Sequence, residues 1–142
     1  MKMGNEDMNT AKPAVFLDRD GTLIEDVNYF LNAVDVGILT SIGSEANSRA
    51  VLEFMSCGKP VIASDVGVIP EIIEDGINGL VFPKKDSQTL TESLTRLFYD
   101  NKLRYNLGIM ARERILRKFS IDKFVQDTEK VYEKAKNLKM VK

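Results

Sequence analysis

The feature that most limits the fold of this chain is a series of short apolar runs that alternate with stretches of helical character. The runs at 14–17, 36–39, 61–63 and 80–82 are β-branched or aromatic and are bounded by polar residues, Gly or Pro, as buried strands are. Helices are expected over 46–57 and 70–75, which Gly58 and Gly76 follow. Alternation of this kind predicts an α/β fold with a parallel sheet of about four strands flanked by helices.

The last third of the chain lacks strand patterns, and its apolar spacing predicts helices. Leu90, Leu94 and Leu97 recur at helical spacing within 87–99, and the spacing continues beyond residue 101. Ser120 is the expected N-cap of a long final helix. One side of that helix carries Ile121, Phe124, Val125, Val131, Tyr132, Ala135 and Leu138. We therefore expect a helical C-terminal third.

The length and the charge of the chain limit its domain organisation and its possible partners. A chain of 142 residues fits one domain, and we expect residues 1–12 to be a flexible tail and 13–142 a single domain. With a net charge of -1, the chain has no overall positive electrostatic field that would attract nucleic acid. Residues 1–101 hold 8 Lys and Arg against 16 Asp and Glu, whereas residues 102–142 hold 12 against 5. The basic C-terminal helices could contact an anionic membrane surface, although charged helix faces are mostly solvated surface.

Cysteine and histidine content excludes several chemistries. Cys57 is the only cysteine and the chain has no histidine, which rules out an internal disulfide, a Cys/His zinc cluster and a histidine base. The composition fits a reducing, cytoplasmic location. Residues 1–12 hold no apolar signal core, and no run of 18 apolar residues is present.

The first motif with chemical meaning is Asp18-Arg-Asp-Gly-Thr22, directly after the first strand. A carboxylate at a strand end can attack phosphorus, and a second one two residues on can move a proton. Residues 14–29 resemble the opening of a haloacid dehalogenase superfamily phosphatase of the heptose bisphosphate and histidinol phosphate branch. This resemblance implies Asp18 as nucleophile, Asp20 as acid/base, and Mg²⁺ held by both residues.

The phosphatase resemblance ends near residue 31. The later acidic pair that such enzymes use for magnesium has no counterpart here, and Thr40, Lys59 and Asp65 lie in surroundings that match another family. The alternative interpretation is a core or edge strand followed by a solvated turn.

The second motif is Ser44-Glu45 with Glu53 eight residues later. In a helix this separation is just over two turns, or roughly 12 Å of rise. A helix that starts after a strand has unpaired N–H groups suited to a diphosphate. A carboxylate one or two turns further can accept hydrogen bonds from ribose hydroxyls. The alternative is a pair of solvated charges.

The sequence around this motif resembles a known family. Segments 35–41, 45–53, 55–64, 69–76 and 78–83 follow the order of the donor-binding half of retaining GT-B glycosyltransferases of group 1. This resemblance implies that Glu45 faces the sugar, that the amides after it contact sugar and phosphate, and that Glu53 binds ribose. The implied donor-binding residues are Ser44, Glu45, Ala46, Asn47, Ser48, Arg49, Glu53 and Gly67. Residues 46–50 depart from the usual Gly-Phe-Gly-Leu-Pro of the family.

Together these motifs predict a chimera with a Rossmann-like domain. Residues 13–31 supply a phosphatase-like strand and turn, and 33–142 supply half of a glycosyltransferase donor domain. The family's acceptor domain and diphosphate-neutralising Arg and Lys have no counterpart here. We expect weak binding of a nucleotide diphosphate or nucleotide sugar, no cofactor, no turnover by the chain alone, and homo-oligomers through exposed apolar surface. The alternatives are a magnesium-dependent phosphatase using Asp18 and an inert chimeric or assembly module.

Overall fold

The structure, a computed structural model, describes residues 15–16, 31, 33–43 and 48–139. Its centre is a parallel sheet with the strand order β1-β2-β3-β4. The strands are β1 (Val15–Phe16), β2 (Gly37–Leu39), β3 (Val61–Ser64) and β4 (Leu80–Phe82). The register places Ile38 beside Ile62, and Ile62 beside Leu80. The predicted four-stranded parallel sheet is confirmed.

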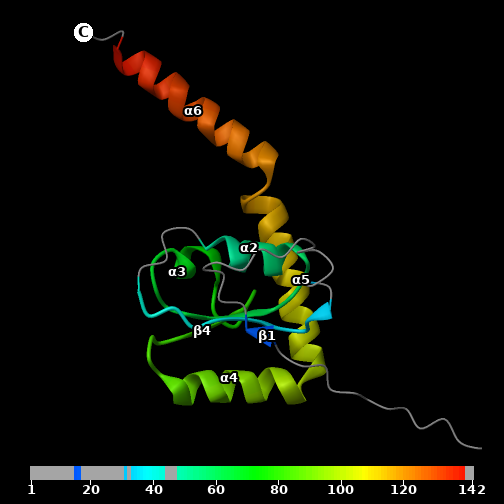
Figure 1. Cartoon of the computed structure of the whole chain (residues 1–142). Coiled ribbons are helices and arrows are strands. Elements are labelled where there is room, and N and C mark those ends of the chain that lie inside the picture. The colour runs from blue at the N-terminus through cyan, green and yellow to red at the C-terminus, as the bar shows by residue number, and fades with distance from the viewer. Residues whose placement is uncertain (1–14, 17–30, 32, 44–47, 140–142) are drawn as a thin grey trace, which may run out of the picture.

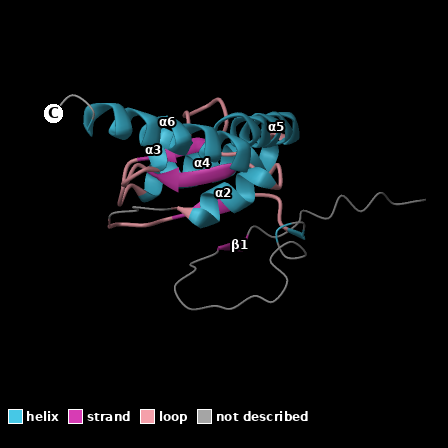
Figure 2. Ribbon diagram, turned by 90° about the horizontal axis from the view of Figure 1, so that it is seen from above, coloured by secondary structure: helices cyan, strands magenta, loops and turns pink. Residues whose placement is uncertain are grey.

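The described helices cover both faces of the sheet. They are α2 (Arg49–Ser56), α3 (Ile69–Ile72), α4 (Ser87–Tyr99), α5 (Asn101–Lys118) and α6 (Ile121–Lys139). Figure 1 shows α2 and α3 on one face, α4 on the other, and α5 standing along one side. Viewed from above, β1 lies at the edge of the sheet (Figure 2). The α/β class and the helical C-terminal third are therefore both as predicted.

Two apolar clusters follow from this layering. The first joins α2 and α3 to one face of the sheet and includes Phe54, Met55 and Ile69. The second lies under the other face, where Ile62 and Phe82 meet Leu97 of α4. All four residues of β3 are buried, as expected for the strand between two neighbours and two helical layers. Burial on both faces explains why the strand runs are continuously apolar rather than alternating.

Two glycines allow close approaches between elements. A Cβ on Gly37 would lie 2.6 Å from the Phe54 ring, so the missing side chain makes room for Phe54 on the sheet. A Cβ on Gly108 of α5 would lie 2.2 Å from the backbone oxygen of Gly58, in the turn between α2 and β3. Because that neighbour is backbone, it cannot rotate away. Gly108 therefore sets how closely α5 packs against this turn.

The helix boundaries sharpen the sequence prediction. Ser48 has non-helical dihedrals and is the N-cap of α2, so this helix begins at Arg49 rather than at residue 46 as predicted. Helix α3 ends at Ile72 instead of residue 75, because Ile73 is already extended. The predicted cap of the final helix is confirmed: the Lys123 amide donates to Ser120 Oγ at 3.2 Å. Short polar residues such as serine are more favourable at the N-cap position than within the first turn of a helix.

Asp86 caps α4 in a way that sequence analysis had not identified. Its carboxylate accepts hydrogen bonds from the Thr89 amide at 3.0 Å, the Thr89 hydroxyl at 2.7 Å and the Gln88 amide at 3.1 Å. The backbone and side-chain bonds from Thr89 lower the pKa of Asp86, because they stabilise its charged form. The cap fixes the start of α4 directly after β4.

The N-terminal strand joins the sheet beside β2. Val15 and Phe16 pair in parallel with Gly37 and Ile38, so the predicted strand at 14–17 is part of the same sheet. Between β1 and β2, Leu31 and Ala33 are helical. Among the helices that the structure describes, none has the length and apolar character needed to cross a membrane.

Candidate functional site

The carboxyl edge of the sheet collects the loops that carry most of the predicted donor-binding residues. Strands β2, β3 and β4 are parallel, so the segments that follow Leu39, Ser64 and Phe82 leave the sheet at one edge. Helix α2 starts from the same edge, since it follows β2 along the chain. In open parallel sheets this is the edge at which ligands bind.

Hydrogen bonds join these three loops to one another. Ser64 Oγ donates to the carbonyl oxygen of Ser41 at 2.7 Å, which links the end of β3 to the loop after β2. The Asp65 amide donates to the Phe82 carbonyl at 2.9 Å, and Asp65 Oδ1 accepts from the Lys84 amide at 2.8 Å. Gly67 has a φ of 56°, a left-handed conformation that suits glycine, in the loop after β3. The loops therefore form a connected rim.

The start of α2 contains a polar group without a partner. Ser48 is 3% exposed, and its hydroxyl makes no hydrogen bond in the described part of the chain. Unlike a usual capping serine, it does not bond to the first-turn amides, and that turn holds no acidic side chain. The first N–H groups of a helix have no intrahelical acceptor, so α2 offers several donors beside this hydroxyl. The arrangement suits an anion with several oxygens.

Glu53 lies one helical turn after Arg49. Its side chain is 33% exposed, and its carboxylate lies 4.0 Å from Arg49 Nη2, at the limit of an ion pair. The Arg49 side chain is 65% exposed and extends into solvent beside the helix start. A half-exposed carboxylate one turn in from an anion site can accept hydrogen bonds from a diol, while the guanidinium can add charge near a phosphate. The structure therefore brings Ser48, Arg49 and Glu53 together on α2.

The other predicted site residues are only partly covered. Ser44, Glu45, Ala46 and Asn47 lie outside the described residues, as do Asp18 and Asp20 of the phosphatase-like turn. Their roles remain predictions. Among the described residues, no group of three or more Asp, Glu or Cys side chains is arranged to hold a metal ion.

Sequence analysis missed the contacts that hold the rim together. It included Gly67 among the donor-binding residues, but it did not assign the Ser64–Ser41 bond or the Asp65–Lys84 bond. The available signal was the position of Ser64 and Asp65, a hydroxyl and a carboxylate directly at the end of a buried strand. Which backbone groups they bond depends on the loop paths, which the sequence does not specify.

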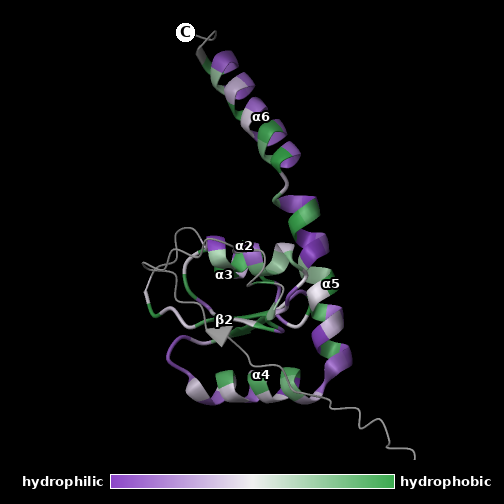
Figure 3. Cartoon of the chain, turned by 45° about the vertical axis from the view of Figure 1, so that its right-hand side comes forward, coloured by the Kyte–Doolittle hydropathy of each residue, from purple (hydrophilic) through white to green (hydrophobic). Residues whose placement is uncertain are grey.

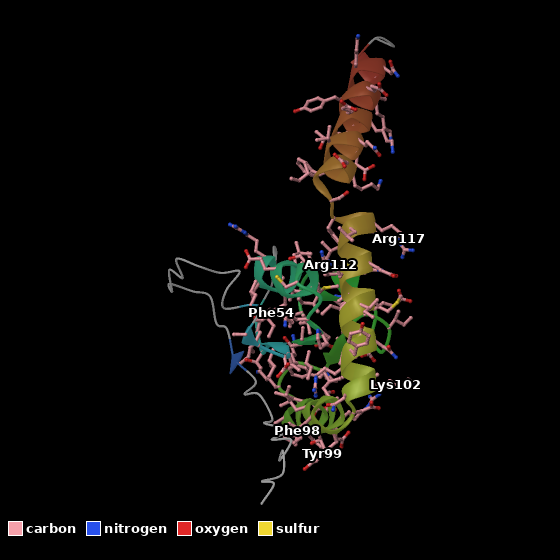
Figure 4. All side chains as sticks on the ribbon, turned by 90° about the vertical axis from the view of Figure 1, so that its right-hand side faces the viewer. Phe54, Phe98, Tyr99, Lys102, Arg112 and Arg117 are labelled. Carbon is pink, nitrogen blue, oxygen red and sulfur yellow. The ribbon has the colours of Figure 1, made fainter. Side chains whose placement is uncertain are left out.

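A groove of about 470 Å³ lies at the opposite, amino edge of the sheet. It runs between the starts of β2 and β3 and the first half of α5, and Figure 4 shows Arg112 of its lining on α5 beside α2. Arg104, another lining residue, is occupied by the Leu97 carbonyl at 2.6 Å and Asn101 Oδ1 at 2.8 Å. The lining residues are Asp35, Gly58, Lys59, Pro60, Asn101, Arg104, Tyr105, Ile109 and Arg112. This groove contains none of the predicted donor-binding residues.

Comparison with known proteins gives consistent matches. Residues 7–100 match the family model described as glycosyl transferases group 1. An uncharacterised glycosyltransferase of Methanocaldococcus jannaschii is 41% identical over 90 residues, which cover 63% of this chain and 25% of that protein. The N-acetyl-alpha-D-glucosaminyl L-malate synthase of Bacillus anthracis is 32% identical over 108 residues, or 76% of this chain and 28% of the relative. The chain thus spans about a quarter of the length of these relatives.

Solved structures show the same fold. HepE of Anabaena, crystallised with UDP, superposes with a TM-score of 0.74 at 25% identity, covering 78% of this chain and 30% of HepE. The structure of HepE with UDP-glucose gives 0.71 at 26% identity, covering 77% of this chain and 30% of HepE. The family match also includes the segment from Asp18 to Thr22, whose phosphatase resemblance stays a prediction.

Proposed function

This chain belongs to the glycosyl transferases group 1 family, and from that premise we propose that it binds a nucleoside diphosphate or nucleotide sugar at the carboxyl edge of its sheet. The diphosphate lies at the start of α2, where Ser48 and the first-turn amides donate hydrogen bonds. The carboxylate of Glu53 accepts hydrogen bonds from the ribose. Glu45 faces the sugar, and the loop with Gly67 lines the opposite side of the site.

The observation that carries this proposal is the buried, unpartnered hydroxyl of Ser48 at the helix start. A buried hydroxyl without a hydrogen bond costs about 1–3 kcal/mol in mutational data, so a ligand that supplies an acceptor recovers that loss. The N-terminal end of the helix also carries a partial positive charge. Both effects favour an anion at one place. HepE, a protein with this fold, was crystallised with UDP and with UDP-glucose, which supports the choice of ligand.

Binding is tested by calorimetric titration of the chain with UDP, GDP and ADP. We expect weak binding of at least one of them, and a loss of about tenfold in affinity for Glu53→Ala, because truncation removes a charged acceptor worth roughly 1.5 kcal/mol. Glu92→Ala is the matched control, since Glu92 is an exposed glutamate on α4, away from the carboxyl-edge loops. Binding that is absent, or equal in both variants, contradicts the proposal.

We further infer that the chain alone binds the donor without transferring its sugar. The comparable region makes up a quarter to a third of the curated relatives. The family resemblance implies that the acceptor lies on another domain and that charged groups elsewhere neutralise the leaving diphosphate. Incubation with UDP-glucose and a panel of sugar acceptors should release no UDP above the rate without protein. Release that depends on Glu53 would overturn this inference.

The magnesium phosphatase alternative has less support, because the family match includes Asp18 and Asp20. It is tested separately, by hydrolysis of p-nitrophenyl phosphate with Mg²⁺. Activity that disappears in Asp18→Asn would establish it. Whether the start of α2 also binds a nucleotide would then be decided by the nucleotide titration.

A further inference from the structure

Helix α6 carries an apolar face that the described chain leaves uncovered. Figures 1 and 3 show α6 extending away from the sheet and its helices, beyond the end of α5, with apolar patches along it. Ile121, Phe124, Val131 and Leu138 are 81%, 71%, 67% and 67% exposed. Figure 4 shows the side chains of α6 standing clear of the rest of the molecule. A contiguous apolar stripe of this kind marks an interaction surface.

The spacing of this face is that of a helix pair. Three-and-four spacing from Ile121 runs through Phe124, Thr128, Val131 and Ala135 to Leu138. A seven-residue repeat with apolar residues at its first and fourth positions is the pattern of a coiled-coil seam. Val125 and Tyr132 flank one side of the seam, and Asp127 and Lys134 flank the other. The pattern covers the whole length of α6.

From this geometry we propose that α6 pairs with α6 of a second copy of the chain in an antiparallel arrangement. In that register, each layer of the seam places one residue of the first helix opposite one residue of the second. The residue numbers of the two add up to the same value in every layer. Ile121 meets the partner's Leu138, Phe124 meets the partner's Ala135, and Thr128 meets the partner's Val131. A large side chain thus faces a small one in the Phe124 layer, as close packing of a helix pair needs.

The flanking positions support the same register. The Asp127 carboxylate comes opposite Lys134 of the second copy, and two-fold symmetry creates this ion pair twice. On the other flank Val125 comes opposite the partner's Tyr132, which extends the apolar contact. A two-fold interface must be self-complementary, and this face meets that requirement in charge as well as in size. In the single chain Asp127 is bonded to Lys123 at 2.6 Å and to Lys130 at 3.3 Å. No ion pair of Lys134 is seen among the described residues of its own helix.

The same charges argue for a protein rather than an anionic membrane as the occupant. Helix α6 holds five lysines against four acidic residues, so the basic excess of residues 102–142 belongs mainly to α5. A membrane-surface helix instead carries a strongly basic polar face. Leu116 and Phe119 at the end of α5 are 63% and 40% exposed, and the antiparallel partner helix would end near them and extend the contact.

The first test measures association of the chain by sedimentation velocity over a concentration series. We expect a reversible dimer for the wild type. Val131→Asp should raise the dissociation constant at least about tenfold, because it places carboxylates in the central layer of an apolar seam. Gln126→Asp is the matched control, since Gln126 lies on the opposite face of α6 and should not affect association. Circular dichroism of each variant establishes that α6 still forms.

The second test exchanges the flanking charges and is specific for the antiparallel register. Asp127→Lys alone and Lys134→Asp alone each place like charges opposite one another at both symmetry-related 127–134 positions, which should weaken association roughly tenfold. Mixing the two variants in equal amounts creates two opposite-charge pairs again and should restore wild-type association. A parallel pair would not show this rescue, because position 127 would then face position 132.

Three outcomes overturn the proposal. One is a wild type that remains monomeric at every concentration, which would leave the face for another occupant. Another is a dimer that Val131→Asp does not affect, or whose charge variants fail to rescue one another. The third is wild-type binding to phosphatidylserine vesicles that Val131→Asp abolishes. Because none of these measurements involves nucleotide, they are independent of the function proposed for the carboxyl edge.

Discussion

The two edges of the sheet are built by different means. At the amino edge, Gly108 of α5 packs directly against the Gly58 backbone and the Pro60 ring. Arg104 donates a hydrogen bond to the Leu97 carbonyl at the end of α4. At the carboxyl edge, hydrogen bonds among Ser41, Ser64, Asp65 and Lys84 join loops, and the Ser48 hydroxyl is buried without a partner. The first edge is held together by packing and internal hydrogen bonds, whereas the second has unused hydrogen-bonding capacity.

This difference predicts that the amino edge contributes to the stability of the fold, whereas the carboxyl edge also contributes to ligand binding. A groove alone does not indicate function: the amino-edge groove has volume, but Arg104, one of its charged groups, already bonds within the chain. The carboxyl edge offers donors that a ligand can use. Substitutions at the amino edge should therefore change the free energy of unfolding, and substitutions at the carboxyl edge should also change nucleotide affinity.

The largest effect is expected for Gly108→Ala. The added Cβ would lie 2.2 Å from the Gly58 oxygen, so α5 must move away from the turn between α2 and β3. Overpacking of this kind typically costs about 1–3 kcal/mol, which exceeds the gain of up to about 1 kcal/mol from replacing glycine inside a helix. Chemical denaturation measures the loss of unfolding free energy.

Gly43→Ala is the matched control, because a Cβ at Gly43 meets no atom within 4 Å. It should leave the unfolding free energy nearly unchanged. Nucleotide affinity of folded Gly108→Ala should equal that of the wild type. A stable Gly108→Ala variant, or one whose affinity falls, would remove the distinction between the two edges.

Ser64→Ala should have an intermediate effect. The hydroxyl donates to the Ser41 carbonyl, and loss of one hydrogen bond of this kind costs about 1 kcal/mol. Because the bond fixes the loop after β2 relative to β3, nucleotide affinity should fall together with stability. Thermal unfolding and calorimetry on the same sample measure both. Equal affinity in Ser64→Ala and wild type would show that the rim does not position the ligand.

Asp86 should give a smaller, pH-dependent effect. Hydrogen bonds lower the pKa of its carboxyl in the folded chain, so this group stabilises the fold above its unfolded pKa and loses that contribution as the pH falls through the folded pKa. The Tm difference between wild type and Asp86→Asn should therefore be largest near neutral pH and shrink in acid. Asp122→Asn, on α6, serves as a control. A difference that grows in acid would contradict this assignment.

The smallest effect on binding is expected for Arg112→Ala. Arg112 lines the amino-edge groove, at the opposite end of the strands from Ser48 and Glu53. Its removal should leave the UDP affinity unchanged in a calorimetric titration. A loss as large as that of Glu53→Ala would place the nucleotide in the groove instead.

The fold could be predicted from the sequence because its signals are local. Continuous apolar runs such as 61–63 predicted buried strands, and Ser120 predicted a cap that the Lys123 amide confirms. Contacts between distant segments could not be predicted in this way. The approach of Gly108 to Gly58, 50 residues away, depends on how α5 packs and has no signature in the local sequence.

The candidate site was predicted in part. Glu53 and the start of α2 followed from motif spacing, and Ser48 was included in the predicted set, although it was expected to be helical. Its role as a buried cap without a partner depends on the packing around α2 and emerged only from the structure. The bonds of Ser64 and Asp65 likewise depend on loop paths that their residue types alone do not define.

The most direct test of the carboxyl-edge site is amide hydrogen exchange with and without saturating UDP. The first-turn amides of α2 lack intrahelical acceptors, so they should exchange readily in the free chain and slow down when a phosphate accepts from them. We predict slower exchange at 49–51 and 65–67 and no change at 58–59 or 104–112. Protection limited to the amino-edge groove, or absent despite calorimetric binding, would contradict the account.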